Sequence, residues 1–335
     1  MKTITILTGC YNEEENVEVV YDRVRRAMLQ VGRYSYEHLF IDNSSTDNTV
    51  AILKRIAVRD HNVRIIVNAR NFGQIRSPMH ALLEARGDAV ISIVADLQDP
   101  PEMIPEIIAR WEEGYSMVLC IKKASKENPL MFWARTKFYQ AVQRLSSIRT
   151  FEHFTGFGLY DRRVIEIMRA FKDPYPYFRG MVAEIGLPYH ELFYEQPVRY
   201  RGVTKNNFYT LYDLGMLGIT NLSKVPLRIV TFTGLASSIL CILSGLAYFI
   251  YKLLYWNSFS TGIAPLIMGL FFFGSVQMLS LGIIGEYVGA IYTQVQARPY
   301  VVEKERINFE YSPGEPLGDD PGESRNGDET LRLHR

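Results

Sequence analysis

Short apolar runs alternate with segments of helical periodicity in the first part of the chain. The runs at 3–10, 37–42, 63–67, 88–95 and 115–121 are rich in β-branched residues, as buried strands are. Between them apolar residues recur every three or four positions, as Val17, Val20 and Val24 do. Strands that alternate with helices predict an α/β fold with a doubly wound, mostly parallel sheet.

Capping residues predict where the helices begin and end. Asn12, with Glu15 three residues later, is the predicted N-cap of the first helix. The pair Ser77-Pro78 predicts the start of the third helix, and Gly87 predicts its end. Asp99, which precedes Pro100, is the predicted cap of the fourth. Residues 155–163 predict a strand or loop that leads into a helix ending at Phe171, and 196–204 predict a further strand.

Two long stretches without charge follow the α/β region. Residues 229–251 and 263–285 contain no Asp, Glu, Lys or Arg, and each is long enough to span a hydrocarbon core of about 30 Å. A buried core helix is the alternative for either stretch, but two in succession favour a transmembrane hairpin. The sequence therefore predicts a soluble domain followed by two transmembrane helices.

The segments around the two spans complete this organisation. Residues 206–228 predict interfacial helices that lead to the membrane, 286–311 a C-terminal segment, and the polar tail 312–335 disorder. Basic residues flank the spans on the side of the soluble domain, whereas the hairpin loop carries only Lys252. The positive-inside rule then places the soluble domain and both termini in the cytoplasm, on a cell (inner) membrane that the chain crosses twice.

Composition excludes several classes of function. The formal net charge of +1 gives no electrostatic case for nucleic acid as a partner. Cys10, Cys120 and Cys241 are too scattered for a metal site or a disulfide framework. The glycine patterns of dinucleotide-binding and P-loop proteins are absent from the sequence.

Polar residues follow the predicted strands at their carboxyl ends, where open α/β sheets bind ligands. Asp42 ends the second strand, and Asp96 and Gln98 follow the fourth. Such oxygen ligands suit Mg²⁺ or Mn²⁺, ions that are usually bound together with substrate phosphates. A single Asp in this position most simply ends a strand, but the pattern over several strands favours a nucleotide held through side chains and a metal.

A series of short motifs, in this order, resembles the family 2 glycosyltransferases that act on polyprenyl phosphates. This family includes dolichol-phosphate mannose synthase and the bacterial GtrB-type sugar transferases, and the resemblance covers residues 1–303. The motifs are Cys10-Tyr-Asn-Glu13, Asp42-Asn-Ser-Ser-Thr-Asp47, Arg70-Asn-Phe-Gly73, Ala95-Asp-Leu-Gln-Asp-Pro-Pro-Glu102, Arg199-Tyr-Arg-Gly-Val-Thr-Lys205, Pro226-Leu-Arg228, Gly285-Glu-Tyr287 and Arg298-Pro-Tyr300.

The resemblance implies a GT-A fold over residues 1–205 and a role for individual residues. The implied nucleotide-sugar site comprises Gly9, Tyr11, Glu13, Asp42, Asn71, Ala95 and Asp96. Asp96 and Gln98 would bind the divalent cation, Mg²⁺ or Mn²⁺, and Arg199, Arg201 and Lys205 the acceptor phosphate. The implied catalytic residues are Asp96, Arg199, Lys205 and Asp161.

The implied reaction is the metal-dependent, inverting transfer of a hexose from a nucleotide sugar to polyprenyl phosphate at the cytoplasmic face of the membrane. Glucose from UDP-glucose, with undecaprenyl phosphate as acceptor, is the favoured case, and the resemblance implies a homo-oligomer, either a tetramer or a dimer. Two alternatives stay open, namely a family 2 transferase that uses another lipid or glycan acceptor, and a degenerate scaffold without catalytic activity.

Several positions depart from the family pattern, among them Gln196 and Asn206, which replace common Arg and Tyr. Gly9 stands where Pro is usual, Asn43 replaces the second Asp of Asp-Asp-Gly-Ser, and Val94 replaces the first Asp of Asp-x-Asp. The family's Gly-Asp-Phe-Arg is replaced by 156–158, which leaves Asp161 as the nearest carboxylate. We therefore expect fewer protein groups on the metal than in other members.

Overall fold

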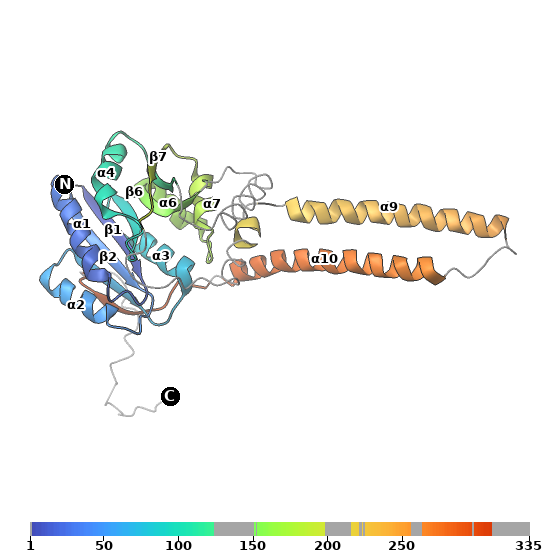
Figure 1. Cartoon of the computed structure of the whole chain (residues 1–335), viewed down its shortest axis with the longest axis horizontal. Helices are drawn as coiled ribbons and strands as arrows, with labels where there is room; N and C mark the ends of the chain where they lie inside the picture. Colours follow the sequence, from blue (N-terminus) through green and yellow to red (C-terminus); the bar gives the residue numbers. More distant parts are fainter. Residues whose placement is uncertain are drawn as a thin grey trace, which may run out of the picture.

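The computed structural model describes residues 2–123, 151, 153–197, 216–220, 223, 225–255, 263–296 and 298–309. An eight-stranded sheet in the order β7-β5-β6-β4-β1-β2-β3-β8 forms the centre of the α/β domain. Helices cover both faces of the sheet, and two long helices extend from the domain side by side (Figure 1).

The five predicted strands are confirmed to within two residues. They are β1 (Thr3–Cys10), β2 (Ser35–Asp42), β3 (Val63–Asn68), β4 (Ala89–Val94) and β5 (Met117–Lys122). β1 pairs in parallel with both β2 and β4, and β2 pairs in parallel with β3. The predicted α/β class with a mostly parallel sheet is therefore confirmed.

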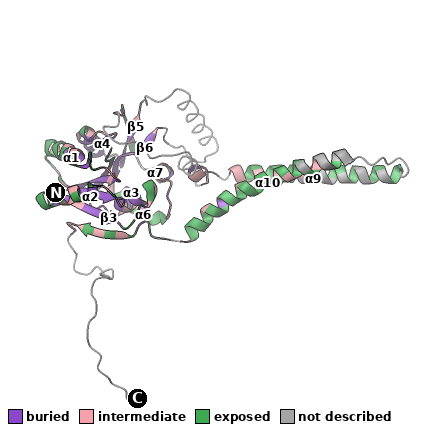
Figure 2. Cartoon of the chain, turned by 60° about the horizontal axis from the view of Figure 1, so that its bottom comes forward, coloured by how far each residue is buried: buried purple, intermediate pink, exposed green. Residues whose placement is uncertain are grey.

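Alternate residues of the strands face two apolar layers, because side chains of a strand alternate between the faces of its sheet. Ile4 and Ile6 of β1 pack in one core cluster with α1 (Val17–Val31) and α4 (Ile104–Glu112). Leu7 belongs to a second cluster with α3 (Gly73–Glu84) and α6 (Arg162–Phe171). Figure 2 shows the buried strands between these exposed helices.

The helix starts predicted at Asn12 and at Ser77-Pro78 are wrong. Asn12 does not cap α1, which begins at Val17; instead its backbone is left-handed, with φ 54°. α3 begins at Gly73, so Pro78 lies inside the helix. Its start is set by the side chain of Asn71, which accepts a hydrogen bond from the backbone N–H of Gly73. α3 ends at Glu84, before the predicted Gly87.

The half of the sheet beyond β4 is mixed. β6 (Phe154–Asp161) runs antiparallel to both β4 and β5, and it leads into α6 as the sequence predicted. α7 (Phe178–Ile185) follows, a helix that the sequence pattern did not predict. β7 (Tyr189–Tyr194) pairs in parallel with β5 at the edge of the sheet.

After the long helices the chain returns to the sheet. The sequence did not predict this return. β8 (Glu303–Ile307) pairs antiparallel with β3 and forms the other edge of the sheet. Glu303 of this strand binds His80 of α3 at 2.5 Å, and Glu305 binds Lys54 of α2 (Thr49–Arg59) at 2.7 Å. These pairs hold the C-terminal segment against the soluble domain.

The two long helices are α9 (Val225–Leu254) and α10 (Ile263–Val295), and they contain the predicted spans 229–251 and 263–285. Large apolar side chains on both helices are exposed, such as Leu240 and Leu270. Within the described residues, the stretch Phe272–Val295 of α10 is long and apolar enough to cross a membrane, and α9 contributes a shorter apolar stretch, Val225–Ser237. By length and composition, the structure thus supports one crossing.

Gly158 provides a test of the β5–β6 pairing. A Cβ atom on Gly158 would lie 2.2 Å from the backbone carbonyl oxygen of Val118 on β5, so the two strands would have to separate. We predict that Gly158→Ala lowers the free energy of unfolding by about 1–3 kcal/mol, as overpacked sites do. Denaturant unfolding of the full chain in detergent measures the change.

Gly9→Ala is the matched control, because a Cβ atom on Gly9 would meet its nearest neighbour, Pro78 Cγ, at 3.8 Å. This variant should unfold like the parent chain. Equal stability of the two variants would contradict the close approach of β5 and β6 at Gly158.

Candidate active site

The register of the parallel strands brings the candidate residues to one edge of the sheet. Gly9 of β1 pairs with Val94 of β4, and Cys10 pairs with Asp42 of β2. Asp42 in turn pairs with Val67 of β3. The loops that follow these strands carry Tyr11, Glu13, Asn71, Ala95, Asp96 and Gln98. The structure therefore gathers these sequence-predicted residues at the carboxyl edge, where α/β sheets bind their ligands.

Asp42 is fully buried at the end of β2. Its Oδ1 accepts a hydrogen bond of 2.9 Å from the backbone N–H of Ser45, and its Oδ2 accepts one from the Ser45 hydroxyl. Burial raises the pKa of the Asp42 carboxyl above its ordinary value, and the bonds from Ser45 oppose this rise. The carboxyl group is therefore fixed in position beneath the loop after β2.

The loops that follow β1 and β2 are bonded to each other. The backbone N–H of Asn12 donates to Ser45 Oγ at 2.8 Å, and Asn12 Oδ1 accepts from the backbone of Thr46 at 2.8 Å. The backbone N–H of Glu13 donates to Thr49 Oγ1 at 2.8 Å. Tyr11 and Glu13, both partly buried, are therefore held on a loop whose position depends on β2.

Asn43 connects β2 to the loop after β3. Its Nδ2 donates to Asn71 Oδ1 at 2.9 Å, and its Oδ1 accepts from the backbone N–H of Phe72 at 2.8 Å. Asn68 Nδ2 donates to the same Asn43 oxygen at 3.2 Å. An amide supplies both the donor and the acceptor that these contacts need, whereas a carboxylate would supply acceptors only. This explains why an amide fits where other members of the resembled family carry Asp.

The turn after β4 presents Asp96 and Gln98. Between them Leu97 has a left-handed backbone, with φ 61°, and its side chain is buried in the core cluster with α1 and α4. Asp96 is 7% exposed, and its Oδ1 accepts from the backbone N–H of Gln98 at 3.1 Å. Burial of Leu97 thus offsets the cost of its unusual backbone and fixes the turn that carries the two oxygen ligands.

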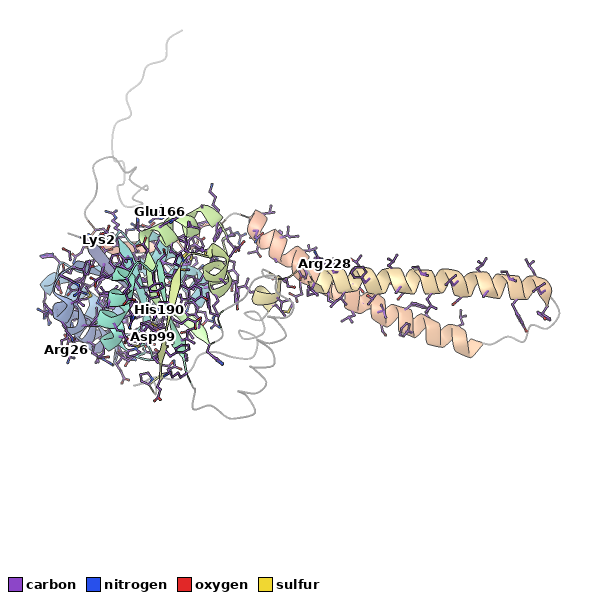
Figure 3. The ribbon with its side chains drawn as sticks, turned by 90° about the horizontal axis from the view of Figure 1, so that it is seen from above. Lys2, Arg26, Asp99, Glu166, His190 and Arg228 are labelled. Carbon is purple, nitrogen blue, oxygen red and sulfur yellow. The ribbon has the colours of Figure 1, made fainter. Side chains whose placement is uncertain are left out.

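Asp99 does not cap a helix, contrary to the sequence prediction. The helical turn Pro101–Met103 follows it, without a side-chain cap. Asp99 lies within the domain (Figure 3). It accepts bonds from the backbone N–H of Val94 at 3.3 Å and from the hydroxyl of Tyr194 at 3.1 Å. Burial raises the pKa of Asp99 to about 7, and the neighbouring Asp96 acts in the same direction. Asp99 therefore anchors the turn after β4 to β7.

Asp161 lies at the end of the sheet where the parallel strands begin, opposite their carboxyl ends, because β6 runs antiparallel to β4. It pairs with Ala89, the first residue of β4, whereas Asp96 follows the last. Its Oδ1 accepts from the backbone N–H of Arg163 as the cap of α6, and its Oδ2 accepts from Trp111 Nε1 at 2.7 Å. Asp161 therefore lies apart from the other predicted site residues at the carboxyl ends of the strands. The predicted Arg199, Arg201 and Lys205 lie outside the described residues.

The turn after β4 carries oxygen donors that suit a divalent cation bound together with a phosphate ligand. Within the residues described, no group of three or more His, Cys, Asp or Glu side chains is placed to hold a metal ion by itself. Asp96 and Gln98 supply one carboxylate and one amide oxygen. Mg²⁺ is commonly bound by one or two protein oxygens together with substrate phosphates, so this sparse donor set suits a cation that arrives with a nucleotide.

Comparison with known proteins identifies the family. Residues 5–168 match the family described as Glycosyl transferase family 2. An uncharacterized glycosyltransferase from Synechocystis is 30% identical, covering 94% of this chain and 98% of the relative. A prophage-derived bactoprenol glucosyl transferase from Shigella flexneri is 33% identical, covering 90% of this chain and 97% of the relative.

The chain therefore belongs to glycosyl transferase family 2. It is a glycosyltransferase, and its α/β domain has the GT-A fold that the sequence resemblance implied.

Asn43 offers a test of the network that shapes the site. In Asn43→Asp the Nδ2 donor is lost and an acceptor faces Asn71 Oδ1. We predict that this variant unfolds with a free energy lower by about 1–3 kcal/mol, the cost of an unsatisfied polar group. Amide hydrogen exchange should also become faster at Phe72 and Gly73. Asn62→Asp, at an exposed position on the far side of the sheet, is the control, and unchanged exchange in Asn43→Asp would argue against the network.

Proposed function

We propose that this chain transfers glucose from UDP-glucose to undecaprenyl phosphate, with inversion at the sugar and with the help of Mg²⁺ or Mn²⁺. The observation that carries the proposal is the alignment of Asp42 and Asp96 at the carboxyl edge of a GT-A sheet. The acceptor and the sugar are supported by the names of relatives that this chain matches over most of their length, among them the bactoprenol glucosyl transferases of Shigella phages SfII and SfV.

The donor nucleotide would lie across the ends of β1, β2 and β3. Asp42 would hold the base or the ribose, because its carboxyl group is fixed there by Ser45. Gly9 leaves open the space that a larger residue would fill, since the nearest atom to its Cβ position is 3.8 Å away. The remaining wall would comprise Tyr11, Glu13, Asn71 and Ala95.

Asp96 and Gln98 would hold the divalent cation on the diphosphate of the donor. When bound, such a cation stabilises the negative charge that develops on the departing nucleoside diphosphate. The protein residues contribute by position, because Leu97 and Asp99 fix the turn from the core side. Asp96 is therefore the residue on which we expect transfer to depend most.

The acceptor supplies its own nucleophile. A lipid phosphate is largely ionised at neutral pH and carries an oxygen that can attack the anomeric carbon, so a strong general base is less needed. The lower need for a general base agrees with the position of Asp161, which lies away from the proposed site. We propose that Arg199, Arg201 and Lys205 hold the acceptor phosphate and reduce the repulsion between two anionic substrates.

The proposed acceptor requires a site at the membrane surface. We propose that 229–251 within α9 and 263–285 within α10 cross the inner membrane. The interfacial segment 206–228 would precede them, and both termini and the domain 1–205 would lie in the cytoplasm. The exposed apolar side chains of both helices support this placement. The segment 286–311 then includes β8, which returns to the domain, whereas 312–335 lie outside the described residues. We further propose a homo-oligomer, a dimer or a tetramer.

Transfer of labelled sugar to undecaprenyl phosphate in detergent tests the proposal. A panel of nucleotide sugars should give a lipid product with UDP-glucose, and EDTA should abolish it. Asp96→Ala should reduce the rate by roughly 100-fold or more, because several kcal/mol of charge stabilisation are lost. Asp161→Ala is the control and should retain transfer in the folded fraction. A chelator-resistant product, or normal turnover of Asp96→Ala, would contradict the metal assignment.

Val94 offers a second test, which measures metal binding directly. Its side chain is 44% exposed at the end of β4, two residues before Asp96. Val94→Asp adds a carboxylate to the site and should tighten the binding of Mn²⁺ in the presence of UDP by roughly tenfold, since affinity rises with the charge of the ligands. Electron paramagnetic resonance of free Mn²⁺ measures the change. Val94→Asn is the matched control, and equal affinity of all three chains would place the metal elsewhere.

A further inference from the structure

Arg70 and Arg76 meet at Phe72 where α3 lies beside the chain that leaves α10, and Arg298 lies close enough for its charge to act on Arg76. The guanidinium carbon of Arg70 is 4.0 Å from the centre of the Phe72 ring, and that of Arg76 is 5.4 Å from the same ring. Arg76 Nη2 donates a hydrogen bond to the backbone carbonyl of Pro299, the residue after Arg298. The structure thus brings two sequence motifs, 70–73 and 298–300, into contact. The proposed transfer reaction gives no role to this contact.

The positive charge of this group is not balanced by neighbouring carboxylates. In the part of the chain that the structure describes, no Asp or Glu forms an ion pair with Arg70, Arg76 or Arg298. By contrast, arginines elsewhere on the domain are paired, such as Arg23 with Glu102 at 2.5 Å and Arg33 with Glu112 at 2.5 Å.

Arg76 is the most constrained member of the group. Its Nε is buried and has no hydrogen-bond partner. Burial lowers the pKa of its guanidinium, and the charges of Arg70 and Arg298 lower it further. A buried donor without a partner costs free energy, and clustered like charges add to this cost. An anion at the cluster would reduce the repulsion between the like charges.

The group lies at the end of α10 that is nearest the soluble domain. Arg298 follows shortly after Val295, the last residue of the apolar stretch Phe272–Val295. Figure 1 shows this end of α10 next to the domain, on the side where α3 lies. If the apolar stretch Phe272–Val295 is the part of α10 that lies in the membrane, which extends the proposed crossing beyond residue 285, then these guanidiniums stand at the level of the lipid headgroups.

We propose that Arg70, Arg76 and Arg298 form a binding site for the phosphate of an anionic phospholipid headgroup. The planar donors of arginine match the oxygens of a phosphate group, and Phe72 holds two of the guanidiniums through its ring face. Free phosphate shares this chemistry, but the position beside α10 favours a lipid. The bound lipid would fix the distance and orientation of the soluble domain relative to the bilayer. The site rests on the proposed membrane insertion, and it is separate from the acceptor residues proposed above.

Binding of short-chain lipids to the full chain in detergent tests this site. Isothermal titration calorimetry should detect short-chain phosphatidylglycerol, with much weaker binding of short-chain phosphatidylcholine and of inorganic phosphate. Arg298→Gln and Arg76→Gln should each weaken the binding of phosphatidylglycerol by about tenfold or more, the effect of losing a charged hydrogen-bond partner. Arg26→Gln is the charge-matched control, because Arg26 lies on the side of the domain away from α9 and α10 (Figure 3).

The same variants separate this proposal from the proposed function. Arg298→Gln should keep its affinity for UDP and its unfolding midpoint, since the described contacts give Arg298 no structural bond. The lipid site would be overturned if the two lipids bound equally well, or if Arg26→Gln lost as much affinity for phosphatidylglycerol as Arg298→Gln. It would also be overturned if inorganic phosphate bound as tightly as phosphatidylglycerol. None of these results would affect the transfer assay, which fails or succeeds on the formation of a lipid-linked sugar.

Discussion

Parallel pairing of β1 with β2 and β4 is the constraint on which the rest of the structure depends. Each strand ends at the same edge of the sheet, so the residues that follow Cys10, Asp42 and Val94 meet there. A slip of one residue in either pairing would turn the apolar side chains of a strand toward the wrong layer. The apolar core on both faces of the sheet therefore also fixes the relative positions of the polar residues at its edge.

Polar groups that are buried at this edge must find partners within the protein. Asp42 is satisfied by Ser45, Asn43 by Asn71 and Phe72, and Asp99 by Tyr194. The bonds of Asp42 close the loop after β2, those of Asn43 join this loop to the loop after β3, and that of Asp99 reaches β7, so that the loops hold their shape by themselves. Such a preorganised wall lowers the cost of binding a ligand, because fewer side chains have to be ordered when it binds.

The pattern of apolar residues predicted β1 to β5 and the two long helices, because buried strands and apolar helices leave strong local signals. It also placed Asp42 and Asp96 correctly at strand ends.

The sequence pattern failed where tertiary contacts decide the outcome. Asp99 resembles a helix cap in sequence, but Tyr194 of a distant strand makes it a buried anchor. Asp161 is the nearest carboxylate to 156–158 in the sequence. The antiparallel direction of β6, however, places it at the end of the sheet where the parallel strands begin. β8 is a short polar strand with no signal of its own, and it forms because β3 offers it an open edge.

We propose above all that the nucleotide binds at the carboxyl edge of β1, β2 and β3. Photo-crosslinking with 5-azido-UDP-glucose, followed by peptide mapping, tests this claim without requiring turnover. We expect the label in peptides that contain 9–16, 42–49 or 68–74, and we expect excess UDP to prevent the labelling. Labelling confined to peptides from the opposite edge of the sheet, such as those around Asp161, would contradict it.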